Sequence, residues 1–220
     1  MIGAGLLAGL GLSTFAAGLA SAQDFYSPDI AKPGFALARI RPGARVPFYR
    51  GDDTPGCPAL TARCRLRAYL VAGDLVLIGT SNGALIEAGF TSDTGRVTIG
   101  WLPARSVQRI PTPAATPAGW QGSWSSDDAE IDIAPGPRGR LTVSGEATWG
   151  SHDPERVRRL GVNYGNFSGE AGPTGASMTI VDKDDSGCRV SLRLIGPYLL
   201  ANDAMQCGGV NVTFSGIYRR

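Results

Sequence analysis

The sequence predicts an all-β protein made of two small antiparallel β-barrels joined by a linker rich in proline and alanine. Three observations support this fold class. Glycine (31 residues) and proline (15 residues) make up about a fifth of the 220-residue chain, and this density disfavours long helices. Short runs with β character alternate with turn signals on both sides of the linker. Residues 111–119 form the one clear break in composition.

Residues 1–22 have the composition of a secretory signal peptide. They carry no charge, consist mainly of leucine, alanine and glycine, and end in Ala20-Ser21-Ala22, which fits an A-x-A cleavage site. The usual positive n-region is missing, so either the true start lies upstream or the segment is an uncleaved anchor. We expect cleavage, which leaves residues 23–33 as an N-terminal extension. Cleavage also implies a periplasmic or secreted protein with no integral membrane span.

Residues 34–110 are predicted to form the first barrel. Six short runs with β character follow one another: 35–39, 44–49, 67–71, 74–79, 84–90 and 96–102. Glycine-containing turns separate them, for example Asn82-Gly83 and Asp93-Thr94-Gly95. This pattern predicts an antiparallel barrel of about five or six strands.

Two short motifs in this segment resemble a bacterial SH3-like domain. They are Gly73-Asp74-Leu75-Val76, and Gly100-Trp101-Leu102-Pro103 followed by Val107. The resemblance spans residues 34–110, but the cysteine loop 51–64 is not part of the minimal pattern. It implies a 3₁₀ turn after the second motif and a ligand groove lined by aromatic side chains, here Phe48, Tyr49, Phe90 and Trp101. The competing interpretation is that each is a core residue, as an aromatic side chain in a strand usually is.

The second barrel is predicted after the linker. The stretch 111–119, PTPAATPAG, is typical of a semi-rigid extended linker because it has three prolines and no charge. Residues 120–220 contain eight strand candidates: 120–125, 130–134, 140–149, 162–169, 177–182, 188–195, 198–202 and 210–218. Several alternate polar and apolar residues, as half-buried strands do. They predict an up-and-down barrel in which the last strand pairs with the first.

The ends of this segment resemble a calycin-like β-barrel, as in the lipocalin and avidin group. Gly122-Ser123-Trp124 matches the G-x-W of the first strand in that group, and Arg219 or Arg220 stands where a terminal arginine packs over the tryptophan. The resemblance thus implies barrel closure by Trp124 and Arg219. The segment 207–219 also resembles the C-terminal signature of secreted proteobacterial proteins of uncharacterised activity. Such a barrel holds one small apolar ligand or is filled by side chains, and we expect it to be filled.

Four cysteines allow three disulfide pairings, and sequence alone does not choose among them. Closure within each domain is the simplest arrangement, with Cys57 bonded to Cys64 and Cys188 bonded to Cys207. A zinc site needs closely spaced pairs and commonly histidine partners, whereas the chain has a single histidine. We therefore predict two disulfides, no metal site and no cofactor.

Two polar motifs suggest chemistry but have simpler interpretations. Ser151-His152-Asp153 contains the residue types of a catalytic triad, yet consecutive side chains on a loop point apart. Asp153-Pro154-Glu155 is instead typical of a helix start. Residues 182–187, DKDDSG, match the opening of a calcium loop, but Arg193 stands where the bidentate acid is expected. A polar hairpin turn is therefore predicted there, and no catalytic residue is predicted in the chain.

The charge distribution narrows the choice of partner. With 21 basic and 19 acidic residues, the net charge of +2 is too even for a general nucleic-acid or membrane-surface binder. Residues 34–111 carry ten arginines against five acids, a net charge of +5. This excess is either an ordinary solvated surface or an anion-binding face.

These features together predict a non-enzymatic periplasmic or secreted protein that binds a peptide, glycan or protein of the cell envelope. One alternative is an inhibitor of a hydrolase such as lysozyme, for which a disulfide-stapled barrel would offer a rigid loop. The other alternative is a carrier of a small lipophilic ligand in the second barrel. The sequence does not define an oligomeric state.

Overall fold

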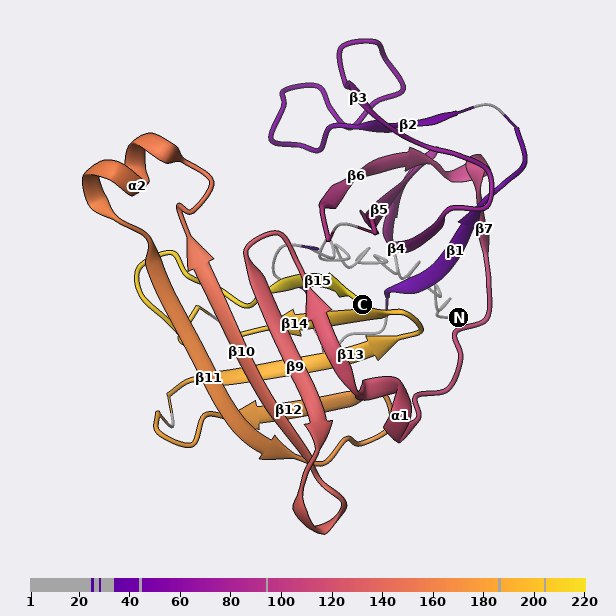
Figure 1. The fold of residues 1–220 in the computed structure, drawn as a ribbon. Coiled ribbons are helices and arrows are strands. Elements are labelled where there is room, and N and C mark those ends of the chain that lie inside the picture. Colours follow the sequence, from indigo (N-terminus) through magenta and orange to yellow (C-terminus); the bar gives the residue numbers. More distant parts are fainter. Residues whose placement is uncertain are drawn as a thin grey trace, which may run out of the picture.

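The computed structural model describes Phe25, Pro28 and residues 34–43, 45–93, 95–185, 187–203 and 205–220. The predicted signal peptide 1–22 and most of the extension 23–33 lie outside these residues. The described chain is all-β and forms two antiparallel sheets, one before and one after the segment 111–119 (Figure 1). The fold class predicted from the sequence is therefore confirmed.

The first sheet contains seven strands in the order β3-β2-β6-β5-β4-β1-β7. Their bounds are Ala36–Ile40 (β1), Val46–Tyr49 (β2), Arg65–Leu70 (β3), Leu75–Asn82 (β4), Leu85–Thr91 (β5), Val97–Pro103 (β6) and Val107–Arg109 (β7). Each of the six predicted strands has a counterpart, and a 3₁₀ turn, Ala104–Ser106, follows β6. Because side chains alternate between the two faces of a strand, one face of this sheet buries Phe48, Leu70 and Leu102 in a common core.

Eight strands form the second sheet, in the order β11-β10-β9-β8-β15-β14-β13-β12. Their bounds are Gly122–Ser125 (β8), Ala129–Pro135 (β9), Leu141–Trp149 (β10), Asn163–Ala171 (β11), Ser177–Val181 (β12), Arg189–Ile195 (β13), Tyr198–Asn202 (β14) and Gly216–Arg219 (β15). The last strand pairs with the first, as predicted, through Arg219 opposite Ser125. The sheet thus curls into a nearly closed barrel that ends at β11 and β12 (Figure 1).

The last strand is shorter than the predicted strand 210–218, because only Gly216–Arg219 is a strand. Phe214 is buried and Thr213 is less so, which means that the alternation seen in the sequence is real. The backbone there is held by the buried carboxylate of Asp203, which accepts hydrogen bonds from the Phe214 N–H at 2.9 Å and the Thr213 hydroxyl at 2.7 Å. A side chain therefore satisfies a backbone group that a neighbouring strand would otherwise bind.

Side chains occupy the interior of the second barrel. Along β10 the residues alternate buried and exposed from Leu141 to Ala147. Trp124 is fully buried, and its indole N–H donates to the carbonyl of Trp120 at 2.9 Å. The packing leaves no room for a side chain at Gly145, where an added Cβ would lie 2.4 Å from the Phe167 ring. The described interior is therefore a packed core, which gives no support to carriage of a lipophilic ligand.

The segment 111–119 is only partly extended. Residues 111–116 have no regular structure, but Pro117–Trp120 forms one helical turn, α1. The side-chain oxygen of Thr116 begins this turn by accepting the N–H of Gly119 at 3.0 Å. The expectation of an extended linker is thus wrong for its last residues.

The helix α2 (Pro154–Leu160) begins where the sequence predicts it. The carboxylate of Asp153 accepts the N–H groups of Glu155 and Arg156, both at 3.0 Å. The helix ends at Gly161, whose φ of 76° lies in the region that favours glycine. No helix formed by the described residues is both long and apolar enough to cross a membrane.

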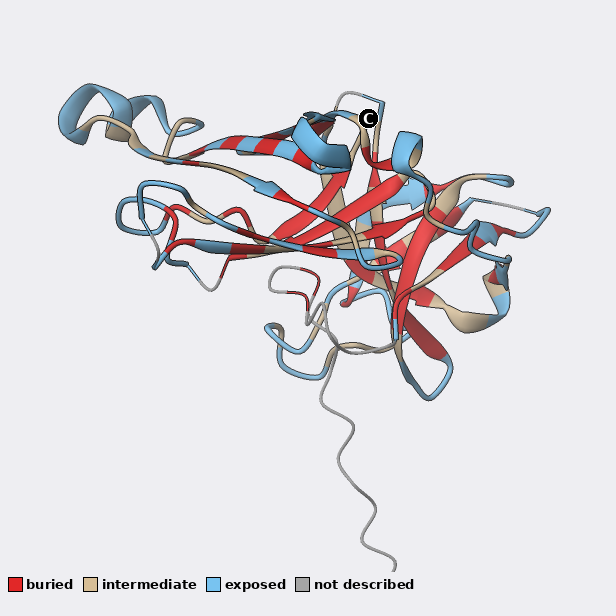
Figure 2. Ribbon diagram, turned by 90° about the horizontal axis from the view of Figure 1, so that it is seen from below, coloured by how far each residue is buried: buried red, intermediate tan, exposed pale blue. Residues whose placement is uncertain are grey.

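A cluster of buried side chains joins the two sheets, and we call it the interdomain cluster. It consists of Phe25, Phe35, Leu37, Leu77, Ile195, Tyr198, Leu200 and Ile217. The Tyr198 hydroxyl crosses this contact and donates to the carbonyl of Leu75 at 2.6 Å. Gly89 leaves room for Ile217, since a Cβ on Gly89 would lie 2.2 Å from Ile217 Cδ1. Buried strand segments of both sheets meet here (Figure 2), so the two halves of the chain are packed together as well as linked.

Candidate functional site

Two of the four predicted groove residues lie side by side on the outer face of the first sheet. Tyr49 on β2 pairs with Trp101 on β6 and, on its other side, with Arg65 on β3. Trp101 in turn pairs with Glu87 on β5. Directly opposed residues of neighbouring strands share a face of the sheet, so these four side chains form one row across it. Both aromatic rings are partly exposed.

The other two predicted groove residues belong to the core. Phe48 is only 1 % exposed, and Phe90 packs from the edge against the same buried cluster. Phe48 precedes Tyr49 on one strand, so the two side chains must point to opposite faces. The resemblance-based prediction is therefore corrected: Tyr49 and Trp101 are available to a ligand on the outer face, and Phe48 is not.

The structure adds residues to this row that sequence reasoning did not select. Arg65, Arg67 and Tyr69 are exposed along β3, and the guanidinium of Arg45 lies 4.3 Å from the centre of the Tyr69 ring. The period-two pattern Arg-x-Arg-x-Tyr in β3 was the available signal. We call the set the aromatic–arginine face: Arg45, Tyr49, Arg65, Arg67, Tyr69 and Trp101.

The charge of the aromatic–arginine face is not neutralised from within. None of Arg45, Arg65 and Arg67 forms a salt bridge with another described residue. The acid in the row is Glu87, which lies beyond Trp101 as seen from the arginines. The face therefore presents guanidinium groups and aromatic rings together, a combination that suits planar anionic groups.

The first disulfide borders this face. Cys57 is bonded to Cys64, as expected for closure within the domain, and the N–H of Arg50 donates to the carbonyl of Cys64 at 2.7 Å. Gly51 follows directly, and a Cβ on it would lie 3.5 Å from the indole nitrogen of Trp101. The cysteine loop thus stands beside Trp101 and fixes one edge of the face.

The predicted barrel-closing pair is partly corrected by the structure. The guanidinium of Arg220, rather than Arg219, lies over the Trp124 ring at 4.6 Å. Arg219 takes part in closure through its backbone, opposite Ser125, and its side chain donates instead to the carbonyl of Thr91 in the first sheet at 2.9 Å. Neighbouring residues of a strand point to opposite faces, so only one of the two arginines can reach the tryptophan.

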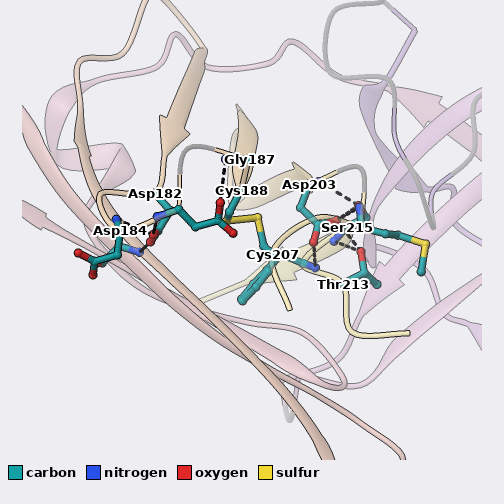
Figure 3. The surroundings of a disulfide bond; sticks show 12 residues. Asp182, Asp184, Gly187, Cys188, Asp203, Cys207, Thr213 and Ser215 are labelled. Atoms are coloured by element: carbon teal, nitrogen blue, oxygen red, sulfur yellow. Dashed lines mark hydrogen bonds between the residues drawn. A yellow bond between two sulfur atoms is a disulfide. The ribbon is translucent and has the colours of Figure 1, made fainter. Parts of the chain in front are cut away.

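The second disulfide joins Cys188 to Cys207, which completes the predicted pairing (Figure 3). Both disulfides indicate an oxidising, non-cytoplasmic compartment. Close to this bond, the carboxylate of Asp182 accepts N–H groups of Ser168 at 2.6 Å and Asp184 at 2.9 Å. These hydrogen bonds hold the pKa of Asp182 below its usual value, and the bond from Ser168 has the largest effect. The described residues of the DKDDSG motif thus form a polar turn, as predicted, and backbone N–H groups of the motif and of β11 stabilise it.

His152 lies between two clefts at one end of the second barrel. One, of about 870 Å³, is lined by Trp149 and residues of α2, and the other, of about 580 Å³, is lined by Gly95 and Arg96 from the turn between β5 and β6. His152 Nε2 lies 3.0 Å from Oδ1 of Asp128.

The same carboxylate also binds the serine that precedes the histidine. The hydroxyl of Ser151 donates to Oδ1 of Asp128 at 3.2 Å. Because Ser151 and His152 both bind Asp128, the serine is not placed as a nucleophile beside a histidine base. Within the described residues, no three histidine, cysteine, aspartate or glutamate side chains are grouped to hold a metal ion.

Comparisons with protein-family models, with curated proteins and with solved structures find no match to this chain.

Proposed function

We propose that the protein is a non-enzymatic binding protein of the cell envelope, periplasmic or secreted, and that its aromatic–arginine face binds an anionic glycan. The observation that carries the proposal is the row in which Arg65, Tyr49 and Trp101 stand on neighbouring strands. Tyrosine and tryptophan offer an apolar ring with a polar edge, which suits the mixed surface of a sugar ring. Arginine supplies paired donors for a carboxylate.

The position and charge of the face support this function. β3 is an edge strand of the first sheet, and β2 and β3 lie away from the second barrel (Figure 1). Residues 34–111 carry a net charge of +5, which attracts a polyanion as it approaches this part of the protein. The signal-like segment 1–22 and the two disulfides support an envelope location. Peptidoglycan, a glycan that bears carboxylates, combines both chemical features in that location.

The test is co-sedimentation of the purified protein with peptidoglycan sacculi. Arg65→Glu with Arg67→Glu should lower the affinity by about tenfold or more, since each charge-assisted hydrogen bond lost contributes about 1.5–3 kcal/mol. Arg189→Glu is the control, because Arg189 is an exposed strand arginine of the second barrel; it makes the same charge change as Arg65→Glu alone and, unlike that variant, should leave binding unchanged. The proposal fails if the wild-type protein stays in the supernatant, or if the double variant and the control bind alike.

A further inference from the structure

The helix α2 projects from the second barrel without a packing partner of its own. It follows the turn after β10, leads back into β11, and contains no buried residue (Figures 1 and 2). The cap at Asp153 and the stacking of Arg156 over the Trp149 ring at 4.0 Å help to hold it. Most helical stability in proteins comes from packing an apolar face, yet the apolar residues of α2, Val157 and Leu160, are both exposed.

Three very exposed apolar residues lie in chain segments that meet where α2 ends. Leu160 is 73 %, Tyr164 is 70 % and Val210 is 75 % exposed, the highest values among the large hydrophobic residues that the structure describes. The N–H of Gly209 donates to the carbonyl of Tyr164 at 3.1 Å, so the loop that carries Val210 is fixed beside β11. We call Val157, Leu160, Tyr164 and Val210 the apolar tip. Exposed apolar groups concentrated at one place mark interaction sites far more often than scattered ones do.

Basic groups lie on one side of the apolar tip, along α2. The helix and its N-cap carry three arginines against two acids, Asp153 and Glu155, and Glu155 lies 3.6 Å from Arg158 and 3.9 Å from Arg159. These ion pairs are exposed, so they hold the arginines only weakly and leave them available to another anion. The helix and its cap therefore carry a net charge of +1 beside the apolar residues of α2.

We infer that the apolar tip docks on the surface of a bilayer that contains anionic phospholipids. Aliphatic side chains beside a tyrosine and arginines are the composition of interfacial membrane sites, where apolar groups enter the headgroup region and arginines meet lipid phosphates. The tip is a projection (Figure 1), and a projection can enter a deformable lipid surface, whereas a folded protein partner would need a matching concavity. The charge surplus selects anionic lipid over a neutral bilayer.

The experiment measures binding of the full chain to vesicles of equal parts phosphatidylglycerol and phosphatidylcholine, and to vesicles of phosphatidylcholine alone. Leu160→Ser with Val210→Ser should lower partitioning to the anionic vesicles by about tenfold or more, because two apolar side chains no longer enter the interface. Val181→Ser, a change at a less exposed strand position of the same barrel, is the matched control and should bind as the wild type does. All replaced side chains are exposed, so the variants should keep the wild-type melting temperature.

A reporter separates the apolar tip from every other lipid-binding part of the chain. Tyr164→Trp should shift its emission to shorter wavelength and be quenched by brominated phospholipid in the anionic vesicles, whereas Tyr69→Trp, on the first sheet, should not. Equal partitioning of the tip variant and the wild type, or an unquenched Tyr164→Trp, overturns the inference. The inference is also overturned if analytical ultracentrifugation without lipid shows that the wild type is a dimer and that Leu160→Ser with Val210→Ser abolishes this dimer. Peptidoglycan binding by the same variant is unchanged in either case, so the inference and the proposed function are tested separately.

Discussion

Tyr198 should make the contact between the two sheets sensitive to alkaline pH. Its ring is fully buried in the interdomain cluster, and burial raises the pKa of its hydroxyl from 10.0 to about 12. The unfolded chain ionises at the lower value, so the stabilising contribution of the neutral form is complete below pH 10 and is lost as the pH rises toward 12. At pH 11, which lies about one unit above the pKa of the unfolded chain and about one unit below that of the folded chain, ionisation favours the unfolded state by about tenfold. This factor corresponds to about 1.4 kcal/mol of lost stability.

The variant Tyr198→Phe isolates this contribution. At pH 8 it should be less stable than the wild type by about 1–2 kcal/mol, because the 2.6 Å hydrogen bond to the Leu75 carbonyl is lost. Since phenylalanine does not ionise, the wild type alone loses the pH-dependent term, and the gap should shrink by about 1.4 kcal/mol at pH 11. Urea denaturation followed by tryptophan fluorescence at both pH values measures the gap. The buried Tyr218, whose pKa burial also raises, is present in both proteins and cancels.

The matched control is Tyr164→Phe, because the Tyr164 ring is 70 % exposed and its hydroxyl meets water in both states. The gap between this variant and the wild type should be the same at pH 8 and pH 11. A gap for Tyr198→Phe that also stays constant would falsify the assignment of Tyr198 as a buried, hydrogen-bonded group of the interdomain cluster.

Three further substitutions test other parts of the packing. Asp203→Asn should destabilise the protein by about 1–3 kcal/mol in urea denaturation, because an amide nitrogen replaces an acceptor of buried N–H and hydroxyl groups. Gly89→Ala should cost about 1–3 kcal/mol through overpacking of the interdomain cluster, whereas Gly172→Ala, with open space around it, should leave the melting temperature nearly unchanged. Cys188→Ser with Cys207→Ser should lower stability by about 3 kcal/mol, as expected for a disulfide that spans 19 residues, and after reduction, which also opens Cys57–Cys64, the variant and the wild type should be equally stable.

The strands were predictable because alternation and turn residues are local signals. Each predicted strand has a counterpart, since period-two burial and glycine turns are encoded within a few residues. The segment 210–218 shows the limit of this reasoning. Its alternation was interpreted as a strand, yet Asp203, several residues away, binds its backbone. Alternation reports which side chains are buried, and it does not report which group satisfies the backbone.

The site was predictable only in part, for a related reason. Alternation separates Phe48 from Tyr49, but which face of the sheet is covered depends on the curvature of the whole domain. The pairing of Arg45 with Tyr69, and of Asp128 with His152, joins residues that the sequence places 24 positions apart in each case. No spacing rule marks such pairs. The disulfides were predicted because closure within each domain left few alternatives.

The interdomain cluster changes what the linker composition implied about the two halves of the chain. A linker between two domains is expected to let the domains move relative to each other. Here a large movement of one sheet away from the other would expose Phe25, Tyr198 and Ile217 to water. The aromatic–arginine face and the apolar tip are therefore held at a fixed distance by packing. We propose that one surface binds glycan and the other binds lipid. Once either surface is bound, the effective concentration of the other ligand at its own surface rises, although no additional interaction is formed. Weak binding at either surface alone is then sufficient for the chain to stay where both ligands occur together.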